Sequence, residues 1–321
     1  MGEDELIAHY FAPLAGPGGL GLRDDAALLA PPAGCELVVT CDAVVAGVHF
    51  FPDDPPDAIA RKALRVNLSD LAAKGADPLG FLLALALPDG WTPDWLAAFA
   101  QGLGDDARAY ACPLLGGDTV RTPGPLTVSI TAMGAVPAGR MVRRTTARPG
   151  DLLYVTGTIG DAALGLQVRQ GRLGAPSEGR AHLLDRYLLP RPRNTLAPAL
   201  RAHASAAMDV SDGLIGDCTK LLRASGVGGC IELARVPLSL AARAAIARDP
   251  ALLETALTGG DDYEVLCAVP PDRAAAIEAM AVGFGVAATL VGVVEADTAP
   301  LTLRDIGGKR LTFSQSSFEH F

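Results

Sequence analysis

Short apolar runs typical of β-strands recur along the whole chain, and amphipathic helical patterns lie between many of them. This interleaving predicts an α/β fold with mixed (α+β) sheets, because the order of the elements is not a strict βαβ rhythm. The strand-like runs span residues 26–30, 36–40, 79–87, 127–135, 152–156, 231–233, 263–269 and 289–293. The clearest helical patterns span residues 5–11, 58–73, 95–110, 161–170, 214–225 and 273–282.

The length and one turn near the middle predict two domains. A chain of 321 residues exceeds the usual size of one domain, which is about 100–200 residues. The sequence Arg-Pro-Gly-Asp at residues 148–151 is typical of a turn and precedes a new apolar strand. We therefore expect an N-terminal domain over residues 1–145 and a C-terminal domain over residues 146–321.

The composition is that of a globular protein and excludes several classes. Hydrophobic residues make up 50% and charged residues 20% of the chain, which argues against extended disorder. The net charge of −9 has the wrong sign for a general nucleic-acid-binding protein. The longest apolar stretch, residues 79–87, is about half of the ~20 residues that a membrane-spanning helix needs. We expect neither a nucleic acid nor a membrane as partner.

The N-terminus and the cysteines indicate a cytoplasmic protein. The first residues, Met-Gly-Glu-Asp-Glu, are acidic, whereas a secretory signal begins with basic and then apolar residues. The six cysteines include no Cys-x-x-Cys pair, which favours buried reduced thiols over a zinc site or a disulfide framework.

Aspartates stand beside glycines, at turns and near the predicted ends of strands or starts of helices. They are Asp24, Asp25, Asp42, Asp70, Asp118, Asp209, Asp212, Asp261 and Asp262. The glycine pairs at residues 116–117 and 259–260 predict binding loops, because glycine lets a ligand approach the main chain. Taken singly, Asp42, Asp70 and Asp212 are equally typical of helix N-caps, and Asp24 and Asp118 of turns. As a set without Cys or His ligands they suit Mg²⁺ and a phosphate-bearing substrate.

The usual nucleotide-binding and nucleophilic motifs are absent from the sequence. There is no P-loop, and the Gly-x-Gly-x-x-Gly at residues 16–21 precedes an apolar strand instead of a helix. Phosphate charge would then be neutralised by several Mg²⁺ ions and by Arg143, Arg144 and Arg148, which are equally typical of a solvated turn. No cysteine has a histidine partner in a known pattern, and the spacing of His49 does not mark it as a general base. Covalent catalysis is therefore disfavoured.

Five motifs, in their order and spacing, resemble those of the thiamine-monophosphate kinases. They are Thr-Cys-Asp-Ala-Val-Val-Ala-Gly-Val-His-Phe at residues 40–50, Asn-Leu-Ser-Asp-Leu-Ala-Ala-Lys-Gly-Ala at 67–76, Gly-Gly-Asp-Thr at 116–119, Asp-Val-Ser-Asp-Gly-Leu at 209–214 and Gly-Gly-Asp-Asp-Tyr-Glu at 259–264. The resemblance implies the two-domain architecture of the aminoimidazole-ribonucleotide-synthetase superfamily. Its N-terminal α/β domain would dimerise through its sheet, its C-terminal α/β domain would complete the active site, and the partner subunit could contribute to it.

The resemblance also implies the roles of individual residues. The Mg²⁺ ions would be held by Asp25, Thr40, Cys41, Asp42, Asp70, Asp118 and Asp209, and a further metal by Asp212. ATP would contact Gly117, Asp118, Arg144 and Ser211, and thiamine monophosphate would contact His49, Asp261 and Phe318.

Three positions depart from the family pattern. Arg23 stands where glycine is usual, Cys41 where threonine is usual, and Asp261 where glutamate is usual. Asp261 is one methylene shorter than the usual residue, so its contact with substrate is the implied role most affected.

The reaction that the resemblance implies is direct in-line transfer of the γ-phosphoryl group of ATP to thiamine monophosphate. This gives thiamine diphosphate and ADP, and it fits the missing nucleophile and base. Two alternatives remain at this stage. One is another ATP-using enzyme of the same superfamily, and the other is a non-catalytic module that binds Mg²⁺ and nucleotide.

Overall fold

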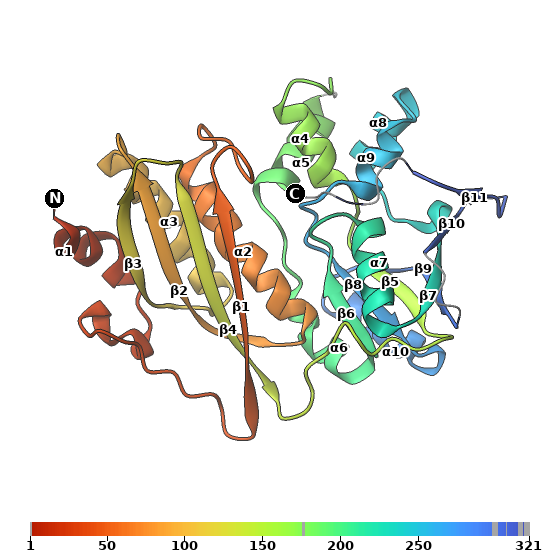
Figure 1. Ribbon diagram of the computed structural model, residues 1–321, viewed down its shortest axis with the longest axis horizontal. Coiled ribbons are helices and arrows are strands. Elements are labelled where there is room, and N and C mark those ends of the chain that lie inside the picture. The colour runs from red at the N-terminus through yellow and green to blue at the C-terminus, as the bar shows by residue number, and fades with distance from the viewer. Residues whose placement is uncertain (1, 175–176, 297–300, 306, 314–316, 318–321) are drawn as a thin grey trace. The chain divides into compact units, whose positions relative to one another are not determined.

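The computed structural model describes residues 2–174, 177–296, 301–305, 307–313 and 317. The chain divides into two compact units, coloured red to yellow and yellow-green to blue in Figure 1. Unit 1 comprises residues 1–71 and 76–140, and unit 2 comprises residues 72–75 and 141–321. The division after Arg140 lies a few residues before the boundary that we predict at residue 145.

Unit 1 is a four-stranded sheet with helices on one face. Its elements are α1 (Glu3–Leu6), β1 (Cys35–Val45), α2 (Pro56–Ala73), β2 (Asp77–Pro88), α3 (Pro93–Ala109), β3 (Leu114–Thr122) and β4 (Thr127–Pro137). The strand order is β1-β4-β2-β3, with β4 antiparallel to both β1 and β2, and β3 parallel to β2. Alternate residues of β2 are buried, such as Phe81, Leu83 and Leu85, while Leu82 and Ala84 between them are exposed.

Charged side chains hold α2 to α3 in unit 1. The carboxylate of Asp106 on α3 is almost completely buried and accepts hydrogen bonds from Arg61 and Arg65 of α2. Arg65 also lies over the ring of Tyr110, at 5.8 Å from the centroid. These contacts fix the helix that carries Asn67 and Asp70.

Unit 2 is built around a seven-stranded mixed sheet with strand order β11-β10-β7-β9-β5-β8-β6. β10 is parallel to β7, and the other pairs are antiparallel. The strands are β5 (Leu152–Thr156), β6 (Ala206–Asp209), β7 (Gly228–Glu232), β8 (Val265–Val269), β9 (Ala288–Glu295), β10 (Thr302–Arg304) and β11 (Arg310–Leu311). The helices are α4 (Asp161–Arg169), α5 (Ser177–Leu188), α6 (Ala197–His203), α7 (Leu214–Ser225), α8 (Leu240–Arg248), α9 (Leu252–Thr258) and α10 (Ala274–Gly283).

Helices cover both faces of the central strands of this sheet (Figure 1). Side chains of α7 and α9 pack with Leu153 and Val155 of β5 in one core cluster. Side chains of α6 and α10 pack with Tyr154 of the same strand in another. Because successive side chains of a strand point to opposite faces, β5 is buried on both sides. This explains why residues 152–155 form an unbroken apolar run.

Some elements differ from those predicted. Residues 26–30 form no strand and are mostly exposed. β1 runs to Val45, so Asp42 lies within the strand instead of after it, and α2 runs to Ala73, so Asp70 lies inside the helix and is not an N-cap. The prediction of a loop at residues 116–117 is wrong, since both glycines belong to β3. Elements that the patterns did not reveal are α5, α6, α8, α9, β3, β6, β10 and β11.

No helix within the described residues is long and apolar enough to span a membrane. All six cysteines are free thiols, and four of them are buried.

Candidate active site

In unit 1, β1 and α2 bring three of the predicted site residues together. The hydroxyl of Thr40 donates a hydrogen bond to the carboxylate of Asp70. The backbone N–H of Asp42 donates to the side-chain oxygen of Asn67, at 3.0 Å. Asp42 pairs with the buried Ile130 across the sheet, so it lies on the face that the helices cover. Thr40, Asp42 and Asp70 therefore share one face of the unit.

His49 lies in the turn that follows β1, and backbone groups fix its position. Its Nδ1 atom accepts a hydrogen bond from the N–H of Val45 at 3.0 Å, and the buried Lys62 donates to its carbonyl at 2.9 Å. With Nδ1 acting as acceptor, a neutral His49 carries its proton on Nε2. The imidazole is thus oriented as a hydrogen-bond donor.

Asp118 lies on the opposite face and at the opposite edge of the same sheet. It pairs with the exposed Ala84 of β2, and β3 is separated from β1 by two intervening strands. Three strand spacings amount to about 14 Å, so Asp118 and Asp42 of one chain do not meet at a single ion. No group of three or more His, Cys, Asp or Glu side chains that could hold a metal occurs within the described parts of the chain.

Gly117 is required beside Asp118 by the close approach of two strands. Its φ angle is +155°, and a Cβ atom at this position would lie 1.8 Å from the carbonyl oxygen of Leu83. The backbone is therefore bare here because β2 leaves no room for a side chain.

In unit 2, the loops that carry Ser211 and Asp261 lie side by side. The N–H groups of Asp261 and Tyr263 donate to the carbonyls of Ser211 and Val210, both at 2.8 Å. A Cβ atom on Gly260 would lie 2.3 Å from the carbonyl oxygen of Ser211. Asp261 and Tyr263 have positive φ angles of 74° and 50°, which are uncommon for residues other than glycine. The structure thus places Asp261 next to the loop that follows β6.

Asp217 and Lys220, which the sequence reasoning missed, fix the loop between β6 and α7. The fully buried carboxylate of Asp217 accepts hydrogen bonds from the N–H groups of Ser211 at 2.9 Å and Asp212 at 2.8 Å. Lys220 donates to Asp217 at 2.9 Å and also pairs with Asp212. An acidic residue in the first turn of a helix is the signal that points to Asp217.

A second buried network, also missed, supports the loop that carries Asp261. Glu264 is completely buried and accepts hydrogen bonds from Arg186, Arg193 and the hydroxyl of Thr156. Asp262 accepts the N–H of Gly160 at 2.7 Å. Burial raises the pKa of Asp262 well above its ordinary value, against the opposing effect of the Gly160 hydrogen bond. The available signal for Asp262 and Glu264 was their position as charged residues just before the apolar strand β8.

The remaining predicted residues have simpler surroundings. Asp25 and the side chain of Arg144 are exposed, and the Arg144 carbonyl accepts a hydrogen bond from Ser225. The Sγ atom of Cys41 lies 3.7 Å from the hydroxyl of Ser129, on the exposed face of the unit 1 sheet. Phe318 lies outside the described residues.

The donor set fits a hard divalent cation. The buried carboxylates of Asp106 and Glu264 are each paired with two arginines. By contrast, within the described ranges no Lys or Arg pairs with Asp25, Asp70 or Asp118. Mg²⁺ prefers oxygen ligands, and a bound cation would supply the counter-charge that these three carboxylates lack in the chain.

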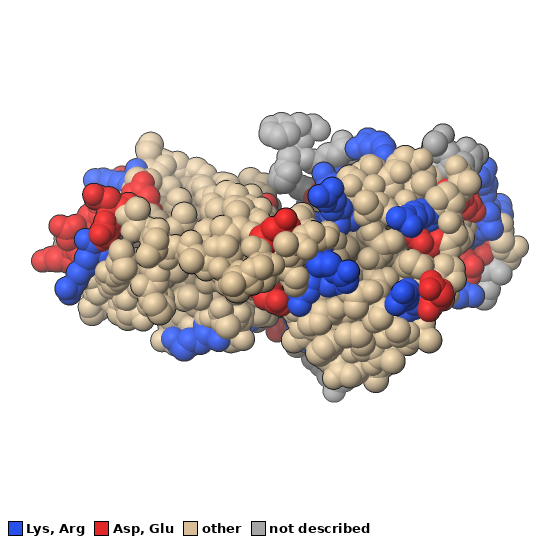
Figure 2. Space-filling model, turned by 90° about the horizontal axis from the view of Figure 1, so that it is seen from below, with Lys and Arg blue, Asp and Glu red and all other residues tan. Residues whose placement is uncertain are grey.

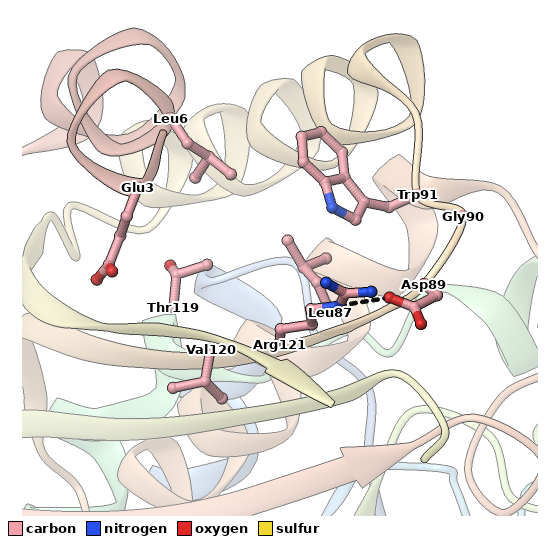
Figure 3. Close-up of a pocket in the computed structure, with 9 residues that line it drawn as sticks. All are labelled: Glu3, Leu6, Leu87, Asp89, Gly90, Trp91, Thr119, Val120 and Arg121. Atoms are coloured by element: carbon pink, nitrogen blue, oxygen red, sulfur yellow. Dashed lines mark hydrogen bonds and ion pairs between the residues drawn. The ribbon is translucent and has the colours of Figure 1, made fainter. Parts of the chain in front are cut away.

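A surface pocket of about 320 Å³ opens elsewhere in unit 1, between α1, the turn after β2 and the end of β3 (Figure 3). Trp91, Leu87 and Arg121 line it, and Arg121 pairs with Asp89 at its rim. None of the predicted site residues lines this pocket. Because the Arg121–Asp89 pair is largely exposed, this pocket has little of the enclosed polar chemistry of an active site.

Comparison with known proteins gives consistent matches over the whole chain. Residues 23–136 match the family model "AIR synthase related protein, N-terminal domain", and residues 148–300 match "AIR synthase related protein, C-terminal domain". The thiamine-monophosphate kinase of Caulobacter vibrioides is 45% identical over 295 residues, which cover 90% of this chain and 83% of the relative.

Solved structures agree with these matches. The crystal structure of thiamine-monophosphate kinase from Stenotrophomonas maltophilia is 40% identical, covers 94% of each chain and superposes with a TM-score of 0.83. A structure of AaThiL complexed with AMPPCP and TMP is 29% identical, covers 100% of this chain and 97% of its own, and has a TM-score of 0.80.

Proposed function

The chain belongs to the thiamine-monophosphate kinases of the AIR synthase-related family, and from this premise we propose how its residues serve the reaction. The enzyme phosphorylates thiamine monophosphate to thiamine diphosphate with ATP. The observation that carries this function is the 45% identity to a thiamine-monophosphate kinase over 90% of the chain. We propose that it works in the cytoplasm.

The γ-phosphoryl group passes directly and in line from ATP to the phosphate of thiamine monophosphate. The acceptor is already an anion, so the reaction needs no strong general base. The fixed orientation of His49, with its proton on Nε2, suits a hydrogen bond to the substrate. Asp261, next to Ser211, and Phe318 complete the proposed contacts with thiamine monophosphate, while Gly117, Asp118, Arg144 and Ser211 contact ATP.

Mg²⁺ is held in this proposal by Asp25, Thr40, Asp42, Asp70, Asp118, Asp209 and the backbone of Cys41, with Asp212 as a further ligand. When bound, the ions neutralise and align the two polyanions. The chain contributes a fixed ligand set, since Thr40 orients the carboxylate of Asp70 and Asn67 holds the backbone of Asp42. This arrangement limits the motion of the donors before substrate arrives.

We propose a homodimer that forms through the exposed face of the unit 1 sheet. This face carries large apolar side chains at Leu37, Val39, Leu82 and Val120, an unusual grouping for a surface. Figure 2 shows another side of unit 1, on which acidic and basic side chains gather at the outer end and, apart from a basic patch at one edge, most of the remaining surface is uncharged. Asp118 lies on the same sheet face, and its distance from Asp42 favours a site completed by the partner subunit.

The dimer is tested by light scattering on two matched variants. Leu82→Glu places a charge on the sheet face and should give monomers with little activity. Leu240→Glu makes the same change at an exposed position of α8 in unit 2 and should leave the mass unchanged. A Leu82→Glu variant that keeps the wild-type mass would refute this interface.

The reaction is tested by ADP release from Mg-ATP with thiamine monophosphate, with thiamine, or with no acceptor. ADP should appear only with thiamine monophosphate, together with thiamine diphosphate identified by chromatography. Binding of ATP without turnover in all three samples would contradict the proposal and favour the non-catalytic module.

The role of Asp70 is tested by Asp70→Asn, which keeps an oxygen that accepts from Thr40. Thermal stability should stay nearly unchanged while turnover falls roughly a hundredfold, the scale of one lost electrostatic contact in the transition state. The exposed Asp94→Asn on α3 is the matched control. A near-normal rate of Asp70→Asn would remove Asp70 from the site.

A further inference from the structure

Lys220 is a cation next to the proposed site that the proposed reaction does not use. It lies on α7, is about one-third exposed, and pairs with the carboxylates of both Asp212 and Asp217. The two carboxylates have different surroundings, because Asp217 is completely buried whereas Asp212 is 34% exposed. Asp217 already accepts hydrogen bonds from two backbone N–H groups, whereas Asp212 lies in the loop between β6 and α7.

We propose that Lys220 is a positioning residue that acts as a built-in counter-cation for Asp212 and competes there with a divalent metal ion. This inference rests on the proposed role of Asp212 in metal binding. An ammonium group and a metal ion that approach the same carboxylate repel each other, so Lys220 must move aside when the metal binds. The ammonium group also donates to Asp217 at 2.9 Å. It can therefore leave Asp212 and still keep one carboxylate partner.

The consequence is a lower affinity for free metal at Asp212. The repulsion between two like unit charges about 4 Å apart in water weakens a binding constant by roughly fivefold. A divalent ion doubles the energy of this repulsion. Salt screens part of the repulsion at a site that is one-third exposed. We therefore expect removal of the Lys220 charge to tighten metal binding at Asp212 by about tenfold.

The test measures binding of Mn²⁺ alone, without nucleotide, by electron paramagnetic resonance of the free ion. Lys220→Met, which keeps the length of the side chain without its charge, should bind the Asp212-dependent ion about tenfold more tightly. Lys220→Arg keeps the charge and should bind like wild type. Arg223→Met removes a charge from an exposed position of the same helix and should also bind like wild type.

Asp212→Asn identifies which bound Mn²⁺ ion depends on Asp212. It also separates the proposed metal site at Asp212 from the proposed competition by Lys220. In that background Lys220→Met should have no effect, because the shared carboxylate is gone. If Asp212→Asn weakens Mn²⁺ binding but Lys220→Met leaves the wild-type affinity unchanged, the competition is refuted while the proposed metal site stands. If Asp212→Asn changes neither Mn²⁺ binding nor turnover, Asp212 is no ligand and both statements about it fail, whereas ADP release by wild type still tests the kinase reaction.

Folding of Lys220→Met is checked independently, since Asp217 loses one partner in this variant. The rise in melting temperature on adding Mn²⁺ measures binding through linkage to unfolding. It should be larger for Lys220→Met than for wild type, even if the variant starts from a lower melting temperature. An equal or smaller rise would refute the proposal.

Discussion

Glu264→Gln should destabilise unit 2 strongly, because the substitution leaves two arginines next to a neutral side chain. Glu264 is completely buried, and Arg186, which is 3% exposed, donates to it at 2.9 Å. Nε and Nη1 of Arg186 have no hydrogen-bond partner among the described residues, so no nearby acceptor replaces the lost charge. The Gln amide would also turn an N–H₂ group toward one of the guanidinium groups.

The size of the effect follows from breaking a buried ion pair by removing one partner, which costs about 3–5 kcal/mol. For a unit of this size, each kcal/mol lowers the melting temperature by about 2–4 °C. The melting temperature of unit 2 should therefore fall by roughly 10 °C. Because Glu264 supports the loop that carries Asp261, turnover should also fall.

Glu232→Gln is the matched control. Glu232 pairs with Arg235 in the same unit, but both side chains are about half exposed, and such pairs contribute about 0–1 kcal/mol. Calorimetry and urea denaturation of the two variants give the comparison directly. The reasoning is refuted if Glu264→Gln lowers the free energy of unfolding no more than Glu232→Gln does.

Three further predictions concern a pH dependence, the thiols and one glycine. Burial holds the pKa of Asp262 well above its ordinary value, so the folded state binds the extra proton and the stabilisation is lost as pH rises through the raised pKa. The free energy of unfolding of wild type relative to Asp262→Asn should thus fall from pH 4 to pH 8 in urea titrations, and parallel profiles would contradict this. Burial raises the pKa of Cys112 and of Cys267 to about 12, so neither should react with a disulfide reagent at pH 8 in the folded protein. Cys41 is exposed on the sheet face and should react in the Leu82→Glu monomer; equal reactivity of all three thiols would refute the assignment. Gly117→Ala should cost several kcal/mol of stability, since its Cβ would overlap Leu83, whereas Gly124→Ala has room; equal urea midpoints would refute it.

Local patterns predicted much of the fold, and long-range geometry accounts for what they missed. The strands β2, β4, β5 and β9 were predicted because their burial requires apolar residues close together in the sequence. β3 was missed because Gly116, Gly117 and Asp118 suit a turn when considered alone. Its extended form depends on pairing with β2, which no local pattern contains.

The same contrast between local patterns and long-range geometry holds for the site. Motif resemblance predicts that Asp42, Asp70, Asp118, Asp209 and Asp212 belong to the site, but it does not indicate that β1 and β3 lie at opposite edges of one sheet. Strand order is a property of the assembled unit, and it decides which carboxylates of one chain can meet. The separation of Asp118 from Asp42 in one chain is the reason that we propose a site completed by a partner subunit.

The surroundings of a carboxylate distinguish its role better than its motif does. Asp217 and Asp262 stand beside the site in sequence, yet both are buried and accept backbone N–H groups, so they hold loops in place. Asp70 and Asp118 are accessible and, within the described ranges, pair with no Lys or Arg. Asp212 is intermediate, because Lys220 provides its counter-charge within the chain, and this makes the Asp212–Lys220 pair the most direct place to test the proposed competition between an ammonium group and a metal ion.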